Sequence, residues 1–513
     1  MKISEDKLKK IFNLMETVVI EGIKAVYEYQ KGNSYLPKYY RYPELFFKGI
    51  ENTEIFDELK QKVDTFKYGI PLFKSTDFNT PKNYGDLFTI IDGMHNINCY
   101  SLNGFKDLLA FFKENKDVNS IISTEEKYID ISIVLYIGNI VNRYLYVTEN
   151  FQDGEIDGDV VKSLIIQQLP RFCMEKLPVN ICVPMCFLQF EDDEIEVTEN
   201  ISICKMSDDF QISRYKVNNF ESTQENEVVQ CAGFMIKIKG YSVNNEGPKS
   251  LHNAISNYWS YPTEMIDDLF AAIRIVVGCR TGYGQLLIEP NEWADEWIAN
   301  LLPIYGATIR AFNKNETETE LFGYCIEIVN KDKILPIRNI FKIISEKREE
   351  VKNSKKSKID QGFKKIFIAI KRLNRCMLRE DDDDTALDAI IGIETLLGGN
   401  EQGEITYKIS NRIAVVAAKL KECPYPPDFA RKAMRTIYGL RSDIVHGREQ
   451  DKNSKILMEE KEILTKDLAI KFLRYSLLFI INNQEYLDVQ KFEKSLDEAV
   501  NSKYSKNLDK DLL

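Results

Sequence analysis

One stretch near the C-terminus, PDFARKAMRTIYGLRSDIVHG, carries an arginine and a histidine five residues apart, Arg441 and His446. The chain has only three histidines, and the other two are His95 and His252. A histidine can take a proton from a hydroxyl group and return one to a leaving oxygen. An arginine can hold a phosphate with its planar guanidinium and balance the charge that builds up on it. These two residue types suit cleavage of RNA, whose 2′-hydroxyl is a built-in nucleophile, so that no metal is required.

The position of His446 on its predicted helix favours this chemistry. Gly447 follows it and is a natural end for a helix. In the last helical turn, the negative end of the helix dipole favours the protonated imidazole. Five residues span about 140° around a helix axis and roughly 7.5 Å along it, so the two side chains border one groove only if a second chain supplies the other wall. The spacing alone is a weak pattern, because a histidine near a helix end is more often a surface or capping residue.

A carboxylate stands inside the apolar helix predicted for residues 385–399, TALDAIIGIETLLGG. Thr385 is a candidate cap for its start, and a left-handed turn at two glycines is expected to end it. Glu394 must be paired or protonated there, because burying a lone charge costs several kcal/mol. It is either part of a structural ion pair or a site carboxylate. Arg412, beside the predicted apolar stripe of the next helix (residues 404–421), is a candidate partner.

The segments LDAIIGIETLLGG, ISNRIAVVA and YGLRSDIVHG follow one another in the last third of the chain. In order and spacing they resemble the Apea-like branch of the HEPN superfamily, over about residues 345–485. The resemblance implies a bundle of four to five helices that dimerises, with the two R-x4-6-H motifs meeting across the interface in one composite RNA-cleaving site. It assigns catalysis to Arg441, His446 and Glu394, and implies a product that ends in a 2′,3′-cyclic phosphate. Several members of the family keep the fold without the activity.

Substrate contacts are expected from Arg412, Tyr438 and Ser442. The residue after the motif arginine is often Asn, Asp or His in the family, and here it is Ser442, with Asp443 next. No cofactor or metal is expected. The expected partners are RNA, a second copy of the chain and a phage-derived trigger, because the arrangement resembles prokaryotic antiviral or toxin-type effectors. The main alternative is a non-catalytic module of the same fold that binds RNA, a nucleotide or a partner protein. A second is a metal-dependent enzyme that uses the acidic run of residues 381–384.

The helices and strands that the sequence predicts along the chain indicate an α+β multidomain protein. A mixed α/β region is expected over residues 1–165, a β-rich or mixed domain and candidate sensor over 166–345, and an all-α HEPN bundle over 346–513. Helices are predicted for residues 1–30, for SLNGFKDLLAFFKEN with Ser101 or Asn103 as its cap, and for MIDDLFAAIRIVVGC. Strands are predicted within residues 176–245, in YGDLFTIIDGM and in QLLIEP. The segment YIDISIVLYIGNIVNRYLYVT is either strands or a buried helix.

Bulk composition sets wider limits. The 513 residues are too many for one core, and 44% hydrophobic with 29% charged content is ordinary for a globular protein. A net charge of −11 argues against a wholly basic nucleic-acid coat, although a small basic patch can act locally. The ten cysteines are scattered and are expected to be small buried residues. The sequence shows no spanning apolar run and no signal-peptide pattern, so a cytoplasmic location with no membrane contact is expected.

Overall fold

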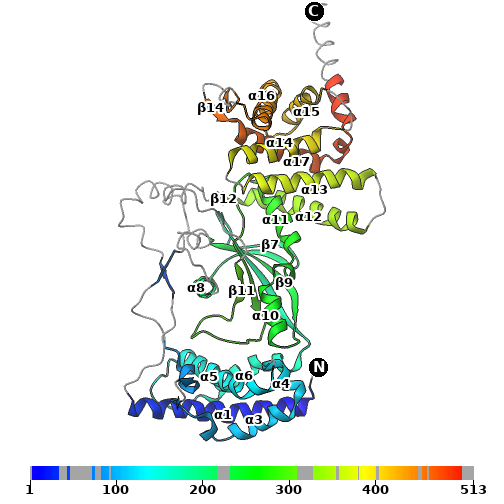
Figure 1. The fold of residues 1–513 in the computed structure, drawn as a ribbon. Coiled ribbons are helices and arrows are strands. Elements are labelled where there is room, and N and C mark those ends of the chain that lie inside the picture. The colour runs from blue at the N-terminus through cyan, green and yellow to red at the C-terminus, as the bar shows by residue number, and fades with distance from the viewer. Residues whose placement is uncertain are drawn as a thin grey trace, which may run out of the picture. The chain divides into compact units, whose positions relative to one another are not determined.

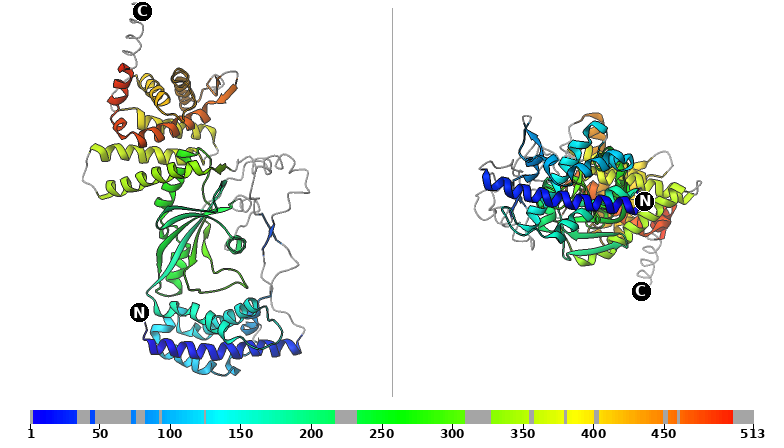
Figure 2. Two further views of the ribbon diagram at one scale, coloured as in Figure 1. Left: turned by 180° about the vertical axis from the view of Figure 1, so that it is seen from behind. Right: turned by 90° about the horizontal axis from the view of Figure 1, so that it is seen from below.

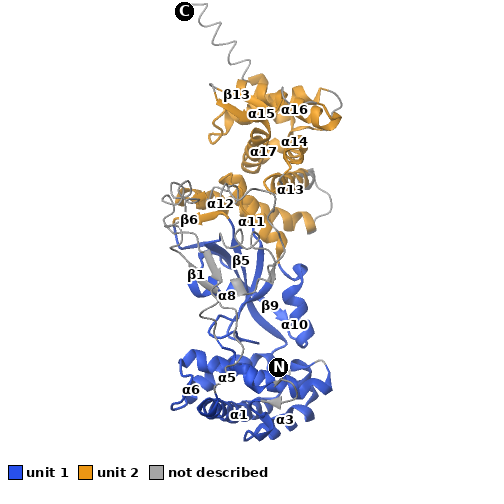
Figure 3. Ribbon diagram, turned by 60° about the vertical axis from the view of Figure 1, so that its left-hand side comes forward, with its two compact units in different colours: residues 1–186, 192–261, 283–323 blue, residues 187–191, 262–282, 324–513 orange. Residues whose placement is uncertain are grey.

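The computed structural model forms two compact units (Figure 3). Unit 1 comprises residues 1–186, 192–261 and 283–323, and unit 2 comprises residues 187–191, 262–282 and 324–513. Both contain helices and strands (Figure 1), so the expected mixed α and β class is confirmed. The structure describes residues 3–33, 43–46, 72–75, 82–91, 94–123, 125–216, 232–308, 327–353, 358–378, 381–399, 404–448, 453–458 and 461–498.

The first part of unit 1 is a helical layer built on the long helix α1, Glu5–Gly32. Ser4 caps this helix by accepting a hydrogen bond from the amide of Lys7. Its buried face, which includes Ile11, Val18 and Val26, joins one apolar core with the helices that follow. Those helices are α3 (Phe105–Glu114), α4 (Lys116–Ile122), α5 (Ile129–Thr148), α6 (Gly158–Gln168) and α7 (Pro170–Cys173). The segment left open between strands and a buried helix is therefore the helix α5.

Two local predictions in this layer were wrong. Helix α3 begins at Phe105 with Gly104 as its N-cap, not with Ser101 or Asn103, because Gly104 adopts a φ of 80° close to the side chain of Thr17. The predicted strand in YGDLFTIIDGM starts as the 3₁₀ helix η3, Tyr84–Phe88, and strand pairing begins later, where β3 (Ile90–Ile91) pairs with β4 (Met94–His95). Asn83 caps η3 through its side chain, so local capping overrides the apolar pattern. Further short elements are η4 (Cys99–Ser101), η5 (Glu126–Tyr128), β1 (Pro43–Phe46) and β2 (Leu72–Ser75).

The second part of unit 1 is an antiparallel sheet, drawn in green in the left view of Figure 2. It has six strands in the order β11-β10-β5-β9-β8-β7. This confirms the strands predicted within residues 176–245 and in QLLIEP. The central strand β5 is almost entirely buried, which matches its β-branched and apolar sequence. The strands are β5 (Lys176–Met185), β7 (Glu194–Thr198), β8 (Ile201–Lys205), β9 (Phe234–Asn244), β10 (Gln285–Pro290) and β11 (Tyr305–Thr308), accompanied by α8 (Asp208–Lys216), α10 (Pro248–Ser256) and η6 (Tyr258–Ser260).

Unit 2 is mainly helical and is centred on α17, Thr465–Asn482, most of whose side chains are buried. Helix α14 packs against α13 and α17, and α15 packs against α16. The helices are α11 (Thr263–Val276), α12 (Lys331–Asn353), α13 (Lys358–Cys376), α14 (Asp382–Leu397), α15 (Ile405–Lys419), α16 (Pro427–His446) and α17, followed by η7 (Gln484–Leu487). The predicted helix MIDDLFAAIRIVVGC is confirmed as α11. Two short strands, β6 (Leu188–Phe190) and β12 (Glu327–Val329), pair in parallel.

The expectation of an all-α C-terminal region was wrong. The strands β13 (Lys455–Met458) and β14 (Lys461–Leu464) form an antiparallel hairpin between α16 and α17. Each strand has four residues and is largely exposed, so its sequence carries little of the apolar alternation that marks a half-buried strand. The start of α14 also differs from expectation, because Asp381 rather than Thr385 is the cap and accepts a hydrogen bond from the amide of Asp384. The acidic run therefore forms the N-terminus of a helix, where negative charge is favourable.

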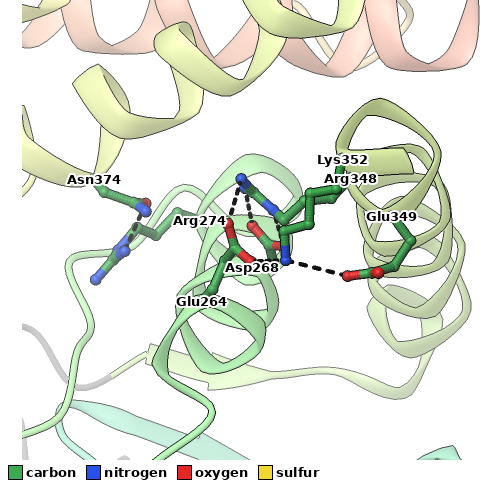
Figure 4. A network of polar contacts seen from close by, with 7 residues as sticks. All are labelled: Glu264, Asp268, Arg274, Arg348, Glu349, Lys352 and Asn374. Atoms are coloured by element: carbon green, nitrogen blue, oxygen red, sulfur yellow. Dashed lines mark hydrogen bonds and ion pairs between the residues drawn. The ribbon is translucent and has the colours of Figure 1, made fainter. Parts of the chain in front are cut away.

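A polar network joins α11 to α12 and α13 inside unit 2 (Figure 4). The guanidinium of Arg348 binds both oxygens of the Asp268 carboxylate, and Asp268 is only 2% exposed. Arg274 donates to the side-chain oxygen of Asn374 at 2.7 Å. Glu264, Lys352 and Glu349 extend the network towards the surface. Among the described residues, no helix is both long enough and apolar enough to cross a membrane.

Candidate functional site

Helix α16 places the Arg441–His446 pair. Pro427 occupies its first turn, where the missing amide hydrogen costs nothing, and Ala433, Ile437 and Leu440 form its buried stripe. The helix ends at His446, because Gly447 adopts a left-handed φ of 62°. The amide of Arg448 donates to the carbonyl of Asp443 at 2.9 Å and closes the turn. The predicted end of this helix is therefore confirmed, and His446 is an exposed side chain in its last turn.

Glu394 on α14 pairs with Arg441 on α16. The Arg441 Nε lies 3.4 Å from Glu394 Oε1, and the two side chains are 39% and 20% exposed. The contact is long, and the Arg441 guanidinium donates no hydrogen bond within the described part of the chain, so its donors remain open to a ligand. The arrangement links two of the three predicted catalytic residues across neighbouring helices.

The predicted Arg412–Glu394 pairing was wrong. Arg412 is 2% exposed, and its Nη1 donates to the carbonyl oxygens of Leu397 and Gly398 at 2.6 and 3.1 Å. Its Nε and Nη2 donate to Glu493 at 3.0 and 2.8 Å. Arg412 thus satisfies carbonyls at the C-terminal end of α14, which have no partner within the helix. Its hydrogen-bonding groups serve the fold of this end of α14.

Tyr438 lies one turn before Arg441 on α16 and is 8% exposed. Burial raises the pKa of its hydroxyl far above the ordinary value, and the negative charge of Glu394 raises it further. Tyr438 therefore stays a neutral phenol beside the Glu394 carboxylate. Tyr438, Arg441 and Glu394 form one cluster, which brings together three of the six predicted site residues.

The remaining predicted contact, Ser442, is partly buried on α16. The next residue, Asp443, accepts a hydrogen bond from the side chain of Asn453 at 2.6 Å. Asn453 also lies against Gly439, where an added β-carbon would come within 2.9 Å of its side chain. The role of Asn453 could not be predicted from the sequence, because the hairpin that it precedes was not predicted. The contact fastens the hairpin region to the helix that carries the site.

The outer surface beside His446 is partly apolar. Val445 is 57% exposed on α16, and Leu457 is 68% exposed on β13. One chain presents one imidazole and one partly free guanidinium here. General acid and general base catalysis need a proton acceptor and a proton donor on opposite sides of the scissile phosphate. One chain therefore offers half of the groups that such a reaction uses.

The other candidate groups lie elsewhere. His252 is exposed in the middle of α10 in unit 1, and the side chain of His95 lies outside the described residues. Within the described part of the chain, no three His, Cys, Asp or Glu side chains gather as ligands for a metal ion. Searches against protein-family models, curated proteins and solved structures found no match to this chain.

Proposed function

We propose that unit 2 carries a metal-independent endoribonuclease site of the HEPN type, centred on Arg441 and His446. The observation that carries the proposal is the arrangement at the end of α16. Its exposed histidine follows, by five residues, an arginine that pairs with a neighbouring carboxylate and donates no hydrogen bond within the described residues. The terminal nitrogens of such an arginine can bind a phosphate in the forked geometry that suits an oxyanion.

In the proposed reaction, His446 accepts the proton of a ribose 2′-hydroxyl as that oxygen attacks the adjacent phosphorus. The bond from phosphorus to the 5′-oxygen breaks, and an imidazolium returns a proton to this leaving oxygen. Arg441 balances the charge that builds up on the phosphate oxygens. The products are a 2′,3′-cyclic phosphate and a 5′-hydroxyl, and no redox partner or metal is consumed.

The proposed site needs two chains. A second copy would supply the second imidazole and guanidinium, and the exposed Val445, next to His446, suits burial against another surface. We further propose that the protein acts in the cytoplasm as an antiviral or toxin-type effector, with unit 1 responding to a phage-derived trigger. The resemblance in the helical segments of unit 2 supports this role, and unit 1 supplies a separate body for sensing.

The test is RNA cleavage by the full-length protein with EDTA present. We expect fragments with 2′,3′-cyclic phosphate ends, and we expect His446→Ala to lower the rate by about 100-fold or more. His252→Ala is the matched control, because His252 is also an exposed helical histidine, and it should cleave like wild type. Light scattering should show a dimer.

Four results would count against the proposal or part of it. Activity that survives His446→Ala places the site elsewhere, and activity lost with EDTA favours a metal-dependent enzyme. RNA that is bound but left whole by the wild type favours the non-catalytic module. A strict monomer that still cleaves would rule out the composite site.

A further inference from the structure

Unit 1 contains a cavity of about 320 Å³, separate from the site proposed in unit 2. This volume is at the lower end of the range of small-molecule sites, roughly 300–1,000 Å³. Its wall is assembled from α5, η3, the end of α4, the start of α10 and the segment of residues 295–296. Because several rigid elements converge on it, the cavity is formed by the fold itself.

Part of the cavity lining is apolar. Ser132, Leu135 and Asn139 lie three and four residues apart along α5, so they share the face that lines the cavity, with Leu135 as its aliphatic member. Leu135 is 51% exposed, and Ile121 and Ile122 at the end of α4 add aliphatic side chains to the lining. An apolar surface of this kind suits the hydrocarbon body of a ligand.

The cavity lining also carries charged groups, and its positive group, Arg171, is already engaged. Arg171 is 3% exposed, its Nε donates to Asp295 at 2.6 Å, and one terminal nitrogen donates to Asn245 at 2.6 Å. Its third nitrogen faces the carbonyl of Ile121 at 3.4 Å. The guanidinium is thus committed to holding Asp295 in place, and it is poorly arranged to accept an anionic ligand.

Glu296 adds a second carboxylate beside Asp295 on the cavity wall. Partial removal from water raises the pKa of Glu296, and the nearby charge of Asp295 raises it further. Arg171 balances one of these two negative charges, which leaves an excess of negative charge at this end of the cavity. A positively charged group entering there would relieve the repulsion between the two carboxylates.

We propose that this cavity binds a small organic cation: a primary amine on an apolar body, with the ammonium facing Asp295 and Glu296. The body lies against Leu135, Ile121 and Ile122. Arg171 is a positioning residue that fixes Asp295. The proposal does not depend on the RNA-cleaving activity of unit 2, because the cavity lies wholly within unit 1.

The test uses three probes with one indole body and different charges, titrated by calorimetry into the full-length protein. The probes are tryptamine, which is cationic, tryptophol, which is neutral, and indole-3-acetate, which is anionic. We expect tryptamine to bind with a Kd of about 1 mM or below, at least about tenfold tighter than tryptophol. Indole-3-acetate should bind most weakly. Equal affinities, a preference for the anion, or no binding of tryptamine at about 10 mM would overturn the proposal.

Two pairs of variants place the binding in this cavity. Glu296→Gln should weaken the binding of tryptamine by about tenfold. Glu292→Gln, four residues earlier and outside the cavity wall, should leave the affinity unchanged. Leu135→Lys puts a competing cation on the wall and should abolish binding. Ile131→Lys, which is equally 51% exposed one turn earlier on α5 but does not line the cavity, should not. A loss of binding in both members of a pair, or in neither, contradicts this location.

Discussion

Two of the arginine–carboxylate clusters in unit 2 differ in how completely the donors of the arginine are used. In the network of Figure 4, Arg348 binds both oxygens of Asp268, with Nε at 2.6 Å, and its remaining terminal nitrogen reaches Glu264 at 3.3 Å. In the candidate site, the Arg441 Nε lies 3.4 Å from Glu394 Oε1, and the guanidinium donates no hydrogen bond to any described residue. The first cluster uses all three of its guanidinium nitrogens within the protein. The second keeps donors available for a ligand.

The two carboxylates also differ in how deeply they are buried. The Asp268 side chain is 3% exposed, and its charge is tolerable only because Arg348 neutralises it. The Glu394 side chain is 20% exposed and Arg441 is 39% exposed, so water can partly solvate both. An Arg–carboxylate pair in a sequence is therefore not informative by itself. A cluster that supports the fold uses the donors of its arginine within the protein. A candidate binding site leaves some of these donors open to a ligand.

The largest effect on stability is expected from Arg348→Met. This change leaves the Asp268 charge buried without its partner and should lower the free energy of unfolding by about 3 kcal/mol. Urea denaturation measures the loss. The double variant Arg348→Met with Asp268→Leu removes both charges and should recover much of it. An unchanged urea midpoint in the single variant would mean that the network does not support unit 2.

Arg441→Ala should lower the activity strongly and the stability only slightly. We expect the rate of RNA cleavage to fall by about 100-fold or more, because the phosphate loses its forked partner. The free energy of unfolding should change by less than about 1 kcal/mol, since the ion pair is partly exposed. The matched control is Arg431→Ala, which removes an exposed arginine paired with Asp428 at the other end of α16. If Arg441→Ala unfolds the protein while cleavage per folded molecule persists, the contrast between the two clusters fails.

Glu394→Gln tests whether the carboxylate positions Arg441. We expect about a tenfold loss in kcat with a smaller change in KM, because a neutral amide holds the guanidinium less firmly. Glu493→Gln is the control, since it weakens the pairing of the buried Arg412 and not that of Arg441. Equal kinetic losses in the two variants would indicate a general loosening of the helices, and no loss in Glu394→Gln would remove Glu394 from the site.

Much of this arrangement could be predicted from the sequence where periodicity and capping are strong. The helices carrying Glu394 and His446 are long, have clear apolar stripes and end at glycines, and their positions were predicted within a few residues. The antiparallel strands between residues 176 and 245 were also predicted, because β-branched runs alternate with polar turns there. The partner of Glu394 could not be predicted, because Arg412 and Arg441 are both plausible until the packing of α15 and α16 is known.

Features set by long-range contacts escaped prediction. The hairpin of β13 and β14 is short and exposed, so the role of Asn453 in holding Asp443 was hidden. The cavity in unit 1 combines residues more than 200 positions apart, such as Asn83 and Glu296. The network around Asp268 joins residues 80 positions apart through the fold of α11 against α12. No local pattern encodes such juxtapositions.

The smallest expected effect concerns two cysteines of unit 2. One lies on α13, which carries Asn374 of the network in Figure 4, and the other lies between α15 and α16. Cys376, two residues after Asn374 on α13, is fully buried, and burial raises its pKa to about 12. Cys423, between α15 and α16, is only partly buried, and its pKa is raised less far. Only the thiolate reacts with alkylating reagents, so at pH 8 roughly one Cys376 in ten thousand is reactive at any moment.

Mass spectrometry after brief treatment with iodoacetamide should therefore find Cys423 modified before Cys376. Labelling of Cys376 in the folded protein should rise about tenfold for each unit of pH, because the thiolate fraction does so below the pKa. Arg348→Met should speed the labelling of Cys376 by loosening the packing of α11, α12 and α13. Arg441→Ala should leave the labelling of Cys423 unchanged, because the loss of a partly exposed ion pair does not open the contact between α15 and α16. If instead Arg441→Ala exposes Cys423 as strongly as Arg348→Met exposes Cys376, both clusters support the fold, and the free donors of Arg441 no longer distinguish the candidate site.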